Sequence, residues 1–82
     1  MKYRSRTETI AQILGAAKGG TSKTKIMYKA YIGYEKLIDY LELLIDNGLI
    51  YYDDKTKVYV TTHKGLLFIE KYIRMAELMG TT

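Results

Sequence analysis

The chain of 82 residues contains no cysteine, no proline and no tryptophan, and it has a single histidine, His63. Without cysteine there is neither a disulfide framework nor a thiolate metal site. One histidine in the first turn of an expected helix offers no paired imidazoles, and no G-x-x-x-x-G-K phosphate loop is present. These absences predict a protein that is not an enzyme and that carries no metal or other cofactor.

Long apolar runs are also missing. No stretch approaches the ~18 apolar residues of a membrane span, and the N-terminus MKYRSRTETI lacks the apolar core of a signal peptide. We therefore expect a cytoplasmic protein with no membrane partner. With 48% hydrophobic residues, a chain of this length should form one small domain with a modest core.

Positive charge is concentrated in the first third of the chain. Residues 1–29 carry seven Lys and Arg side chains and one acid, Glu8, which gives a net charge of +6. Residues 30–52 carry one lysine and four acids, which gives −3. A polyanionic partner should therefore meet the N-terminal third first.

The segment Met27–Leu49 has the pattern of a helix end, a tight turn and a second helix. The second helix should run from about Tyr34 to Asn47, because apolar residues recur there at spacings of three and four. These residues are Tyr34, Leu37, Leu41, Leu44 and Ile45. We expect Gly48 to end this helix in the left-handed conformation, and Gly33 to supply a small or left-handed residue in the turn.

Further elements are expected on both sides of this pair. A basic arm at residues 2–6 should be extended and lead into a first helix capped by Ser5 or Thr7, and a short basic helix should begin after Thr21 or Ser22. Strands are predicted at 49–52 and 58–61, with a polar loop at 53–57 between them. This order predicts a mainly α fold with a small β-hairpin, the winged helix-turn-helix, with the loop as the tip of the wing.

A last helix is expected from His63 to about Met79, with Thr62 as its cap and with Gly65 packed closely on the hairpin or the third helix. It has two apolar stripes, one formed by Leu66, Ile69, Ile73 and Ala76, the other by Phe68, Tyr72, Met75 and Met79. Because a surface helix of a monomer needs one stripe, the second predicts a homodimer through this helix. The alternative is one wide face buried within the monomer.

Several stretches resemble the small archaeal winged-helix DNA-binding proteins. They are Arg4-Ser5-Arg6 before Glu8-Thr9-Ile10, Thr24 to Ala30, Tyr34-Glu35 through Tyr40-Leu41, Asp46 to Ile50, and Tyr59 with Thr61-Thr62 and Lys64-Gly65. The resemblance covers residues 4–72, and Thr24 to Ala30 is its most specific part. The last helix is shorter than in some relatives, and the presumed recognition helix is net acidic.

The resemblance to these proteins and to their viral relatives implies a homodimer that binds double-stranded DNA as a transcriptional regulator or a chromatin-associated protein. It also implies a nucleoid-associated location or the cytoplasm of a host cell. Residues 1–62 would form the DNA-binding domain, and residues 63–82 would form a dimerisation helix packed on it. Two recognition helices about 34 Å apart would read a roughly palindromic site.

The expected DNA contacts are Arg4, Arg6, Lys23, Lys25, Lys29, Tyr34, Glu35, Lys36, Asp39, Tyr40, Lys55 and Lys57. The lysines of the second helix should meet phosphates, and Lys36 should meet a guanine edge or a phosphate. Glu35 accepts from cytosine or only complements the helix dipole. The two arginines would act as a flexible arm, and the wing lysines are opposed by Asp53 and Asp54.

Two alternatives remain open at the level of sequence. Tyr51, Tyr52 and Tyr59 either fill a hairpin face or a dimer interface, or form a stacking platform for single strands. The acidic third helix also suits a protein-interaction module, in which the basic N-terminus would be incidental. The expected dimer interface, Phe68, Tyr72, Met75 and Met79, fits either function.

Overall fold

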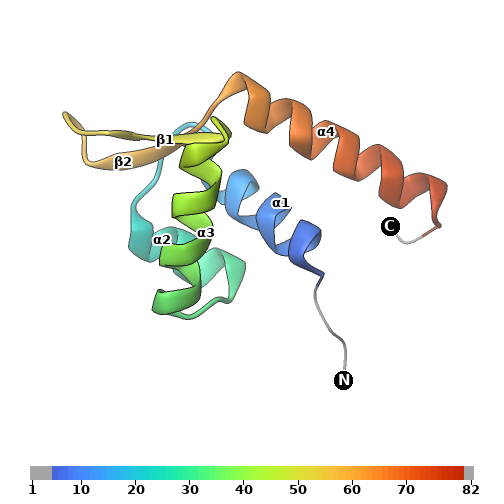
Figure 1. The fold of residues 1–82 in the computed structure, drawn as a ribbon, viewed down its shortest axis with the longest axis horizontal. Coiled ribbons are helices and arrows are strands. Elements are labelled where there is room, and N and C mark those ends of the chain that lie inside the picture. The colour runs from blue at the N-terminus through green and yellow to red at the C-terminus, as the bar shows by residue number, and fades with distance from the viewer. Residues whose placement is uncertain (1–4, 81–82) are drawn as a thin grey trace.

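The computed structural model describes residues 5–80, which form four helices and a two-stranded antiparallel sheet (Figure 1). The elements are α1 (Arg6–Ala16), α2 (Lys23–Ala30), α3 (Tyr34–Asp46), β1 (Ile50–Asp53), β2 (Val58–Thr61) and α4 (His63–Leu78). The mainly helical fold with a hairpin wing, predicted from the sequence, is confirmed. The hairpin and α4 extend in opposite directions from the group of α1, α2 and α3 (Figure 1).

Hydroxyl caps set three of the helix starts. Ser5 accepts from the Glu8 amide at 3.0 Å, Ser22 from the Lys25 amide at 3.2 Å, and Thr62 from the Gly65 amide at 3.1 Å. Because Ser5 caps α1, Arg6 is the first helical residue, and the expectation that it lies in an extended arm is wrong. Its expected partner in that arm, Arg4, lies outside the described residues.

The core is built from one apolar face of each of the first three helices and the start of β1. Its buried members are Ile13, Leu14, Ala17, Ile26, Ala30, Leu37, Leu41, Leu44 and Ile50. The expected inner face of α3 is confirmed at Leu37, Leu41 and Leu44. Tyr34 and Ile45 are exposed instead, because they lie at the edge of that face rather than at its centre.

Each helix is followed by a residue with a left-handed backbone, but the one between α2 and α3 is not the residue that the sequence suggests. Gly48 has φ +72° after α3, as predicted. Gly33 has φ −73° and caps α3, and a Cβ there would meet no atom within 4 Å, so neither a small nor a left-handed residue is needed. The left-handed residue is Tyr31, with φ 51°, because the Ile32 amide turns back to donate to the Met27 carbonyl at 3.2 Å.

The wing is fastened to the C-terminal end of α1. Tyr52 pairs with Tyr59 across the hairpin, with ring centroids 4.8 Å apart. Thr21, just before α2, exchanges two backbone hydrogen bonds with Tyr59, of 3.0 and 2.8 Å, and so adds one residue to the sheet. The buried Thr61 hydroxyl donates to the Leu14 carbonyl at 2.6 Å. These polar ties were not predicted from the sequence.

A second polar joint connects the end of α3 to the start of α4. The Thr62 hydroxyl donates to the Gly48 carbonyl at 2.7 Å, and the Lys64 ammonium donates to the Asn47 carbonyl at 2.8 Å. Both carbonyls follow the last residue of α3, so these two bonds hold the turn after α3 against the start of α4. Close packing at Gly65 is confirmed, since a Cβ there would overlap the Leu49 carbonyl oxygen.

Candidate nucleic-acid interface

The outward face of α2 combines lysines and tyrosines without any carboxylate. Ile26 and Ala30 are buried, which leaves the opposite side of the helix exposed. The exposed residues are Thr24, Lys25, Tyr28 and Lys29. No Asp or Glu occurs between Glu8 and Glu35, so no acid of α2 or its turns offsets this charge. The face can therefore attract phosphate groups.

The starts of α2 and α3 lie next to each other. The Lys23 ammonium is 5.2 Å from the centroid of the Tyr34 ring, a cation–π distance. Tyr34 is 56% exposed. Lys23 and Tyr34, both expected from sequence to contact DNA, are thus brought together where α2 and α3 begin.

A shallow groove runs between α1 and the flank of α3. One hollow of about 270 Å³ is lined by Arg6, Lys36, Asp39, Tyr40 and Leu43. A second of about 310 Å³ is lined by Thr9, Tyr31, Ile32, Gly33, Lys36 and Tyr40. Because Lys36 and Tyr40 border both, the two hollows adjoin. The structure therefore unites Arg6, Lys36, Asp39 and Tyr40 of the predicted set on the flank of α3.

The outermost line of α3 is acidic. Glu35, Asp39, Glu42 and Asp46 follow one another at spacings of four, three and four, so they share the side opposite the buried leucines. All four are exposed. The sequence showed the negative charge of this helix, but the alignment of its acids was not recognised there, although helical periodicity could have revealed it. Phosphates would be repelled by this line and attracted by its basic flanks.

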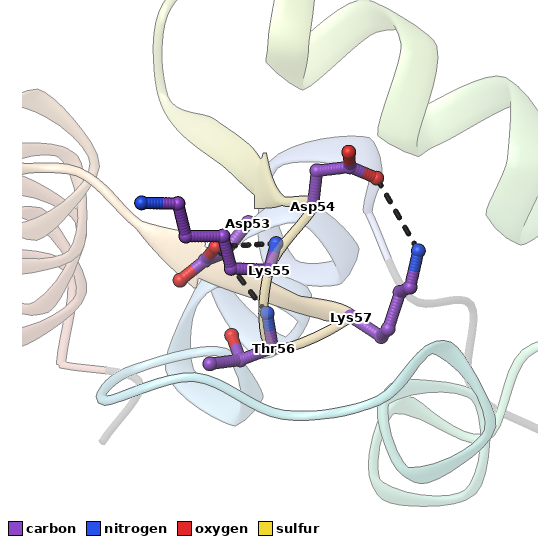
Figure 2. A network of polar contacts seen from close by, with 5 residues as sticks. All are labelled: Asp53, Asp54, Lys55, Thr56 and Lys57. Carbon is purple, nitrogen blue, oxygen red and sulfur yellow. Dashed lines mark hydrogen bonds and ion pairs between the residues drawn. The ribbon is translucent and has the colours of Figure 1, made fainter.

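The tip of the wing is held by its own aspartates (Figure 2). The Asp53 carboxylate accepts from the backbone amides of Lys55 at 3.0 Å and Thr56 at 3.4 Å. Hydrogen bonds from the Thr56 side chain and the Lys55 backbone keep the pKa of Asp53 below its ordinary 3.8. Lys57 lies 3.5 Å from Asp54, both side chains being exposed, while the Lys55 side chain points to another side (Figure 2).

The expected dimer residues on α4 fall into two groups. Phe68 and Tyr72 are half-buried, and Phe68 packs against the core, whereas Met75 and Met79 are exposed. Met79 follows the last turn of α4 as its cap. Leu78, which neither predicted stripe includes, is 88% exposed. The C-terminal half of α4 thus presents an apolar surface that the described part of the monomer does not cover.

Two further features of residues 5–80 bear on function. These residues contain no group of three or more His, Asp or Glu side chains placed to hold a metal ion. None of their helices combines the length and apolar character needed to cross a membrane.

Known proteins resemble this chain along nearly its whole length. The winged helix-turn-helix family matches residues 3–80. Among solved structures, that of Sso10a-2, described as a DNA-binding protein from Sulfolobus solfataricus, is 29% identical and superposes with a TM-score of 0.76. The match covers 95% of this chain and 87% of that one. No curated protein sequence matches.

Proposed function

The chain belongs to the winged helix-turn-helix family, and from this premise we propose that it is a non-enzymatic protein that binds double-stranded DNA. The observation that carries the proposal is the acid-free, lysine-bearing face of α2, next to the exposed start of α3. The similarity to Sso10a-2, which is described as a DNA-binding protein, supports it.

In the proposed complex, Lys25 and Lys29 neutralise phosphates, and Lys23 does so at the edge where it meets Tyr34. The N-terminal turn of α3 enters the major groove first, as in other helix-turn-helix proteins. Lys36 and Tyr40 on its flank contact the backbone or a base edge. The acidic line keeps the rest of α3 away from phosphates, so Glu35 and Asp39 act only where a cytosine amino group can donate to them.

We also propose that the protein acts as a homodimer and regulates transcription. The exposed apolar side chains at the C-terminal half of α4 support a second copy as their partner. Residues 1–62 would then bind DNA, and residues 63–82 would form the dimer contact. A two-fold dimer places two copies of α3 about one helical turn of DNA apart, about 34 Å, and favours a palindromic site.

The test is fluorescence anisotropy of a labelled mixed-sequence duplex at several salt concentrations. Lys25→Ala with Lys29→Ala should weaken binding to every duplex and reduce the slope of log Kd against log salt by about two, one for each lost phosphate contact. Lys71→Ala with Arg74→Ala removes the same charge from α4 and serves as the matched control, with sedimentation equilibrium to establish that its oligomeric state is unchanged. Equal losses in both double variants would show a general charge effect and contradict the proposed face.

The acidic line of α3 favours a second candidate function, a protein-interaction module that binds a basic partner. One measurement separates the two functions. If the unaltered chain does not bind duplex DNA even at low salt, the DNA-binding proposal fails. The acidic line of α3 is then the surface at which a protein partner should be sought. Binding without any sequence preference would instead indicate a chromatin-associated role rather than a regulator.

A further inference from the structure

Two cationic side chains from different helices line one hollow between α1 and α3. Arg6 is the first residue of α1, and Lys36 lies in the first turn of α3. Both border the hollow of about 270 Å³, although they are far apart in the sequence. The packing of α1 beside α3 therefore creates a place where one anion can be approached by positive charge from two helices at once.

Neither of these charges is used within the described chain. Asp39 borders the same hollow and follows Lys36 by three residues on α3, a spacing at which opposite charges can pair. Among residues 5–80, however, neither Arg6 nor Lys36 forms an ion pair with Asp39 or with any other carboxylate. Both cationic residues are exposed. Their charges are therefore available to an anion from outside the chain.

The first turn of α1 gives Arg6 a fixed place on the backbone. The Ser5 hydroxyl accepts from the Glu8 amide at 3.0 Å, and the hydroxyl of the buried Thr9 donates to the Ser5 carbonyl at 3.1 Å. Because Arg6 belongs to a capped helix, little backbone entropy is lost when it binds a ligand. The planar guanidinium group presents several N–H donors, an arrangement that suits a phosphate.

We propose that Arg6 and Lys36 together hold one backbone phosphate of duplex DNA, at a site here named the α1–α3 phosphate site. The site rests on the proposed function, duplex binding, and adds α1 to the interface. Because one phosphate contacts both helices, it fixes the angle at which α3 enters the major groove. Asp39, at the border of the same hollow, repels this phosphate and weakens binding.

The experiment measures the salt dependence of binding to a labelled mixed-sequence duplex by fluorescence anisotropy. Arg6→Ala with Lys36→Ala removes two charges but only one phosphate contact, so the slope of log Kd against log salt should fall by about one. Lys25→Ala with Lys29→Ala should lower the slope by about two, and the control double variant of α4 should leave it unchanged. A fall of two in the first variant would indicate two separate phosphates, and no fall would indicate no contact. Either result would overturn the proposal.

A variant that gains affinity separates this effect from a loss of folding. Asp39→Asn removes the repulsion at the site and should tighten binding to the same duplex about two- to fivefold. Glu42→Gln removes an equal charge from the acidic line of α3, but Glu42 does not line the hollow, so its effect should be smaller. Equal effects of the two variants, or weaker binding by Asp39→Asn, would overturn the proposal.

Inorganic phosphate has the same chemistry as a backbone phosphate and is titrated against the chain without DNA. The NMR shifts of the Arg6 and Lys36 amides should not saturate, and saturation below roughly 1 mM would indicate a free-anion site and overturn the assignment to DNA. If the unaltered chain does not bind duplex DNA, the proposed function fails together with the α1–α3 phosphate site. If it binds and the lysines of α2 behave as expected, a wrong slope for Arg6 and Lys36 overturns the α1–α3 phosphate site alone.

Discussion

At the scale of single residues, Gly65 has the closest neighbours of the described glycines, at the point where α4 meets the hairpin. Gly65 lies against the Leu49 carbonyl, and Thr61 Cγ2 would be 2.6 Å from a Cβ at this position. Both neighbours are fixed, the first as backbone and the second through the buried Thr61 hydroxyl bond to Leu14. Because neither neighbour can move aside, α4 can pack against the hairpin in this way only if residue 65 is a glycine.

Gly65→Ala should therefore lower the free energy of unfolding by about 1–3 kcal/mol, the usual cost of overpacking. Gly15→Ala is the matched control, because a Cβ at this helical position meets nothing within 4 Å. That variant should be stabilised by about 0.5–1 kcal/mol, since alanine favours the helix more than glycine does. Urea unfolding followed by circular dichroism measures both changes, and a Gly65→Ala variant as stable as Gly15→Ala would contradict the packing argument.

At the scale of elements, the Asp53 carboxylate helps to hold the tip of the wing. It accepts from the amides of Lys55 and Thr56, while the Asp53 backbone carbonyl accepts from the Lys57 amide at 2.7 Å. The pKa of the carboxylate is lowered chiefly by the Thr56 side chain and the Lys55 backbone. A carboxyl group with a lowered folded-state pKa stabilises the loop fully above its ordinary value of 3.8, and this contribution is lost as pH falls through the lowered pKa.

The wing loop should thus stay ordered at pH 5 and open only below pH 3.8. NMR shifts of the Lys55 and Thr56 amides, followed from pH 5 to pH 2, should change with a midpoint below 3.8. Asp53→Asn removes the titrating group and should abolish the transition at these two amides. A midpoint at or above 3.8 in the unaltered chain would show that the carboxylate does not hold the loop.

The order and type of the elements were predictable because local signals encode them. Hydroxyl caps such as Ser22 and Thr62, the three-and-four spacing of leucines in α3 and the left-handed Gly48 each act within a few residues. In the turn before α3, a small or left-handed residue was expected at Gly33 because glycine favours such turns. The left-handed residue is Tyr31 instead, because the Ile32 amide donates to the Met27 carbonyl, a bond that the sequence does not reveal. The joining of Thr21 to the wing and of Thr61 to α1 depends on residues distant in the chain.

The candidate interface was predictable only as a list of residues. The lysines of α2 were evident from charge, and the structure shows that Lys25 and Lys29 share an exposed, acid-free face, whereas Lys23 lies against Tyr34. The grouping of Arg6 with Lys36 and Tyr40 arises from the packing of α1 beside α3, which no local pattern specifies.

At the scale of the whole molecule, the proposed dimer depends on α4. Its first half packs on the core through Phe68 and Ile69, while Met75 and Leu78 near its end are exposed. A monomer gains nothing from exposed apolar side chains, whereas a second copy can bury them. The proposed surface for self-association is thus separate from the core, and we expect that it can be altered without unfolding the chain.

Met75→Gln with Leu78→Gln should convert a dimer to a monomer while the charge and the circular dichroism spectrum stay unchanged. Sedimentation equilibrium measures the mass, and binding to a palindromic duplex should weaken in parallel. Ile45→Gln replaces an exposed apolar residue on α3 and should leave the mass unchanged. If the unaltered protein sediments as a monomer at all concentrations tested, the proposed dimer does not form.

The polar joint between Asn47, Gly48, Thr62 and Lys64 has a consequence for evolution. In a dimer formed through α4, the distance between the two copies of α3 depends on the angle at which this joint sets α4. A change at residues 62–64 would then alter the separation between the two half-sites that the protein accepts, without touching any residue that faces DNA. Related proteins could then diverge in operator spacing and in base preference independently, since the residues proposed to set the two properties lie in different parts of the chain.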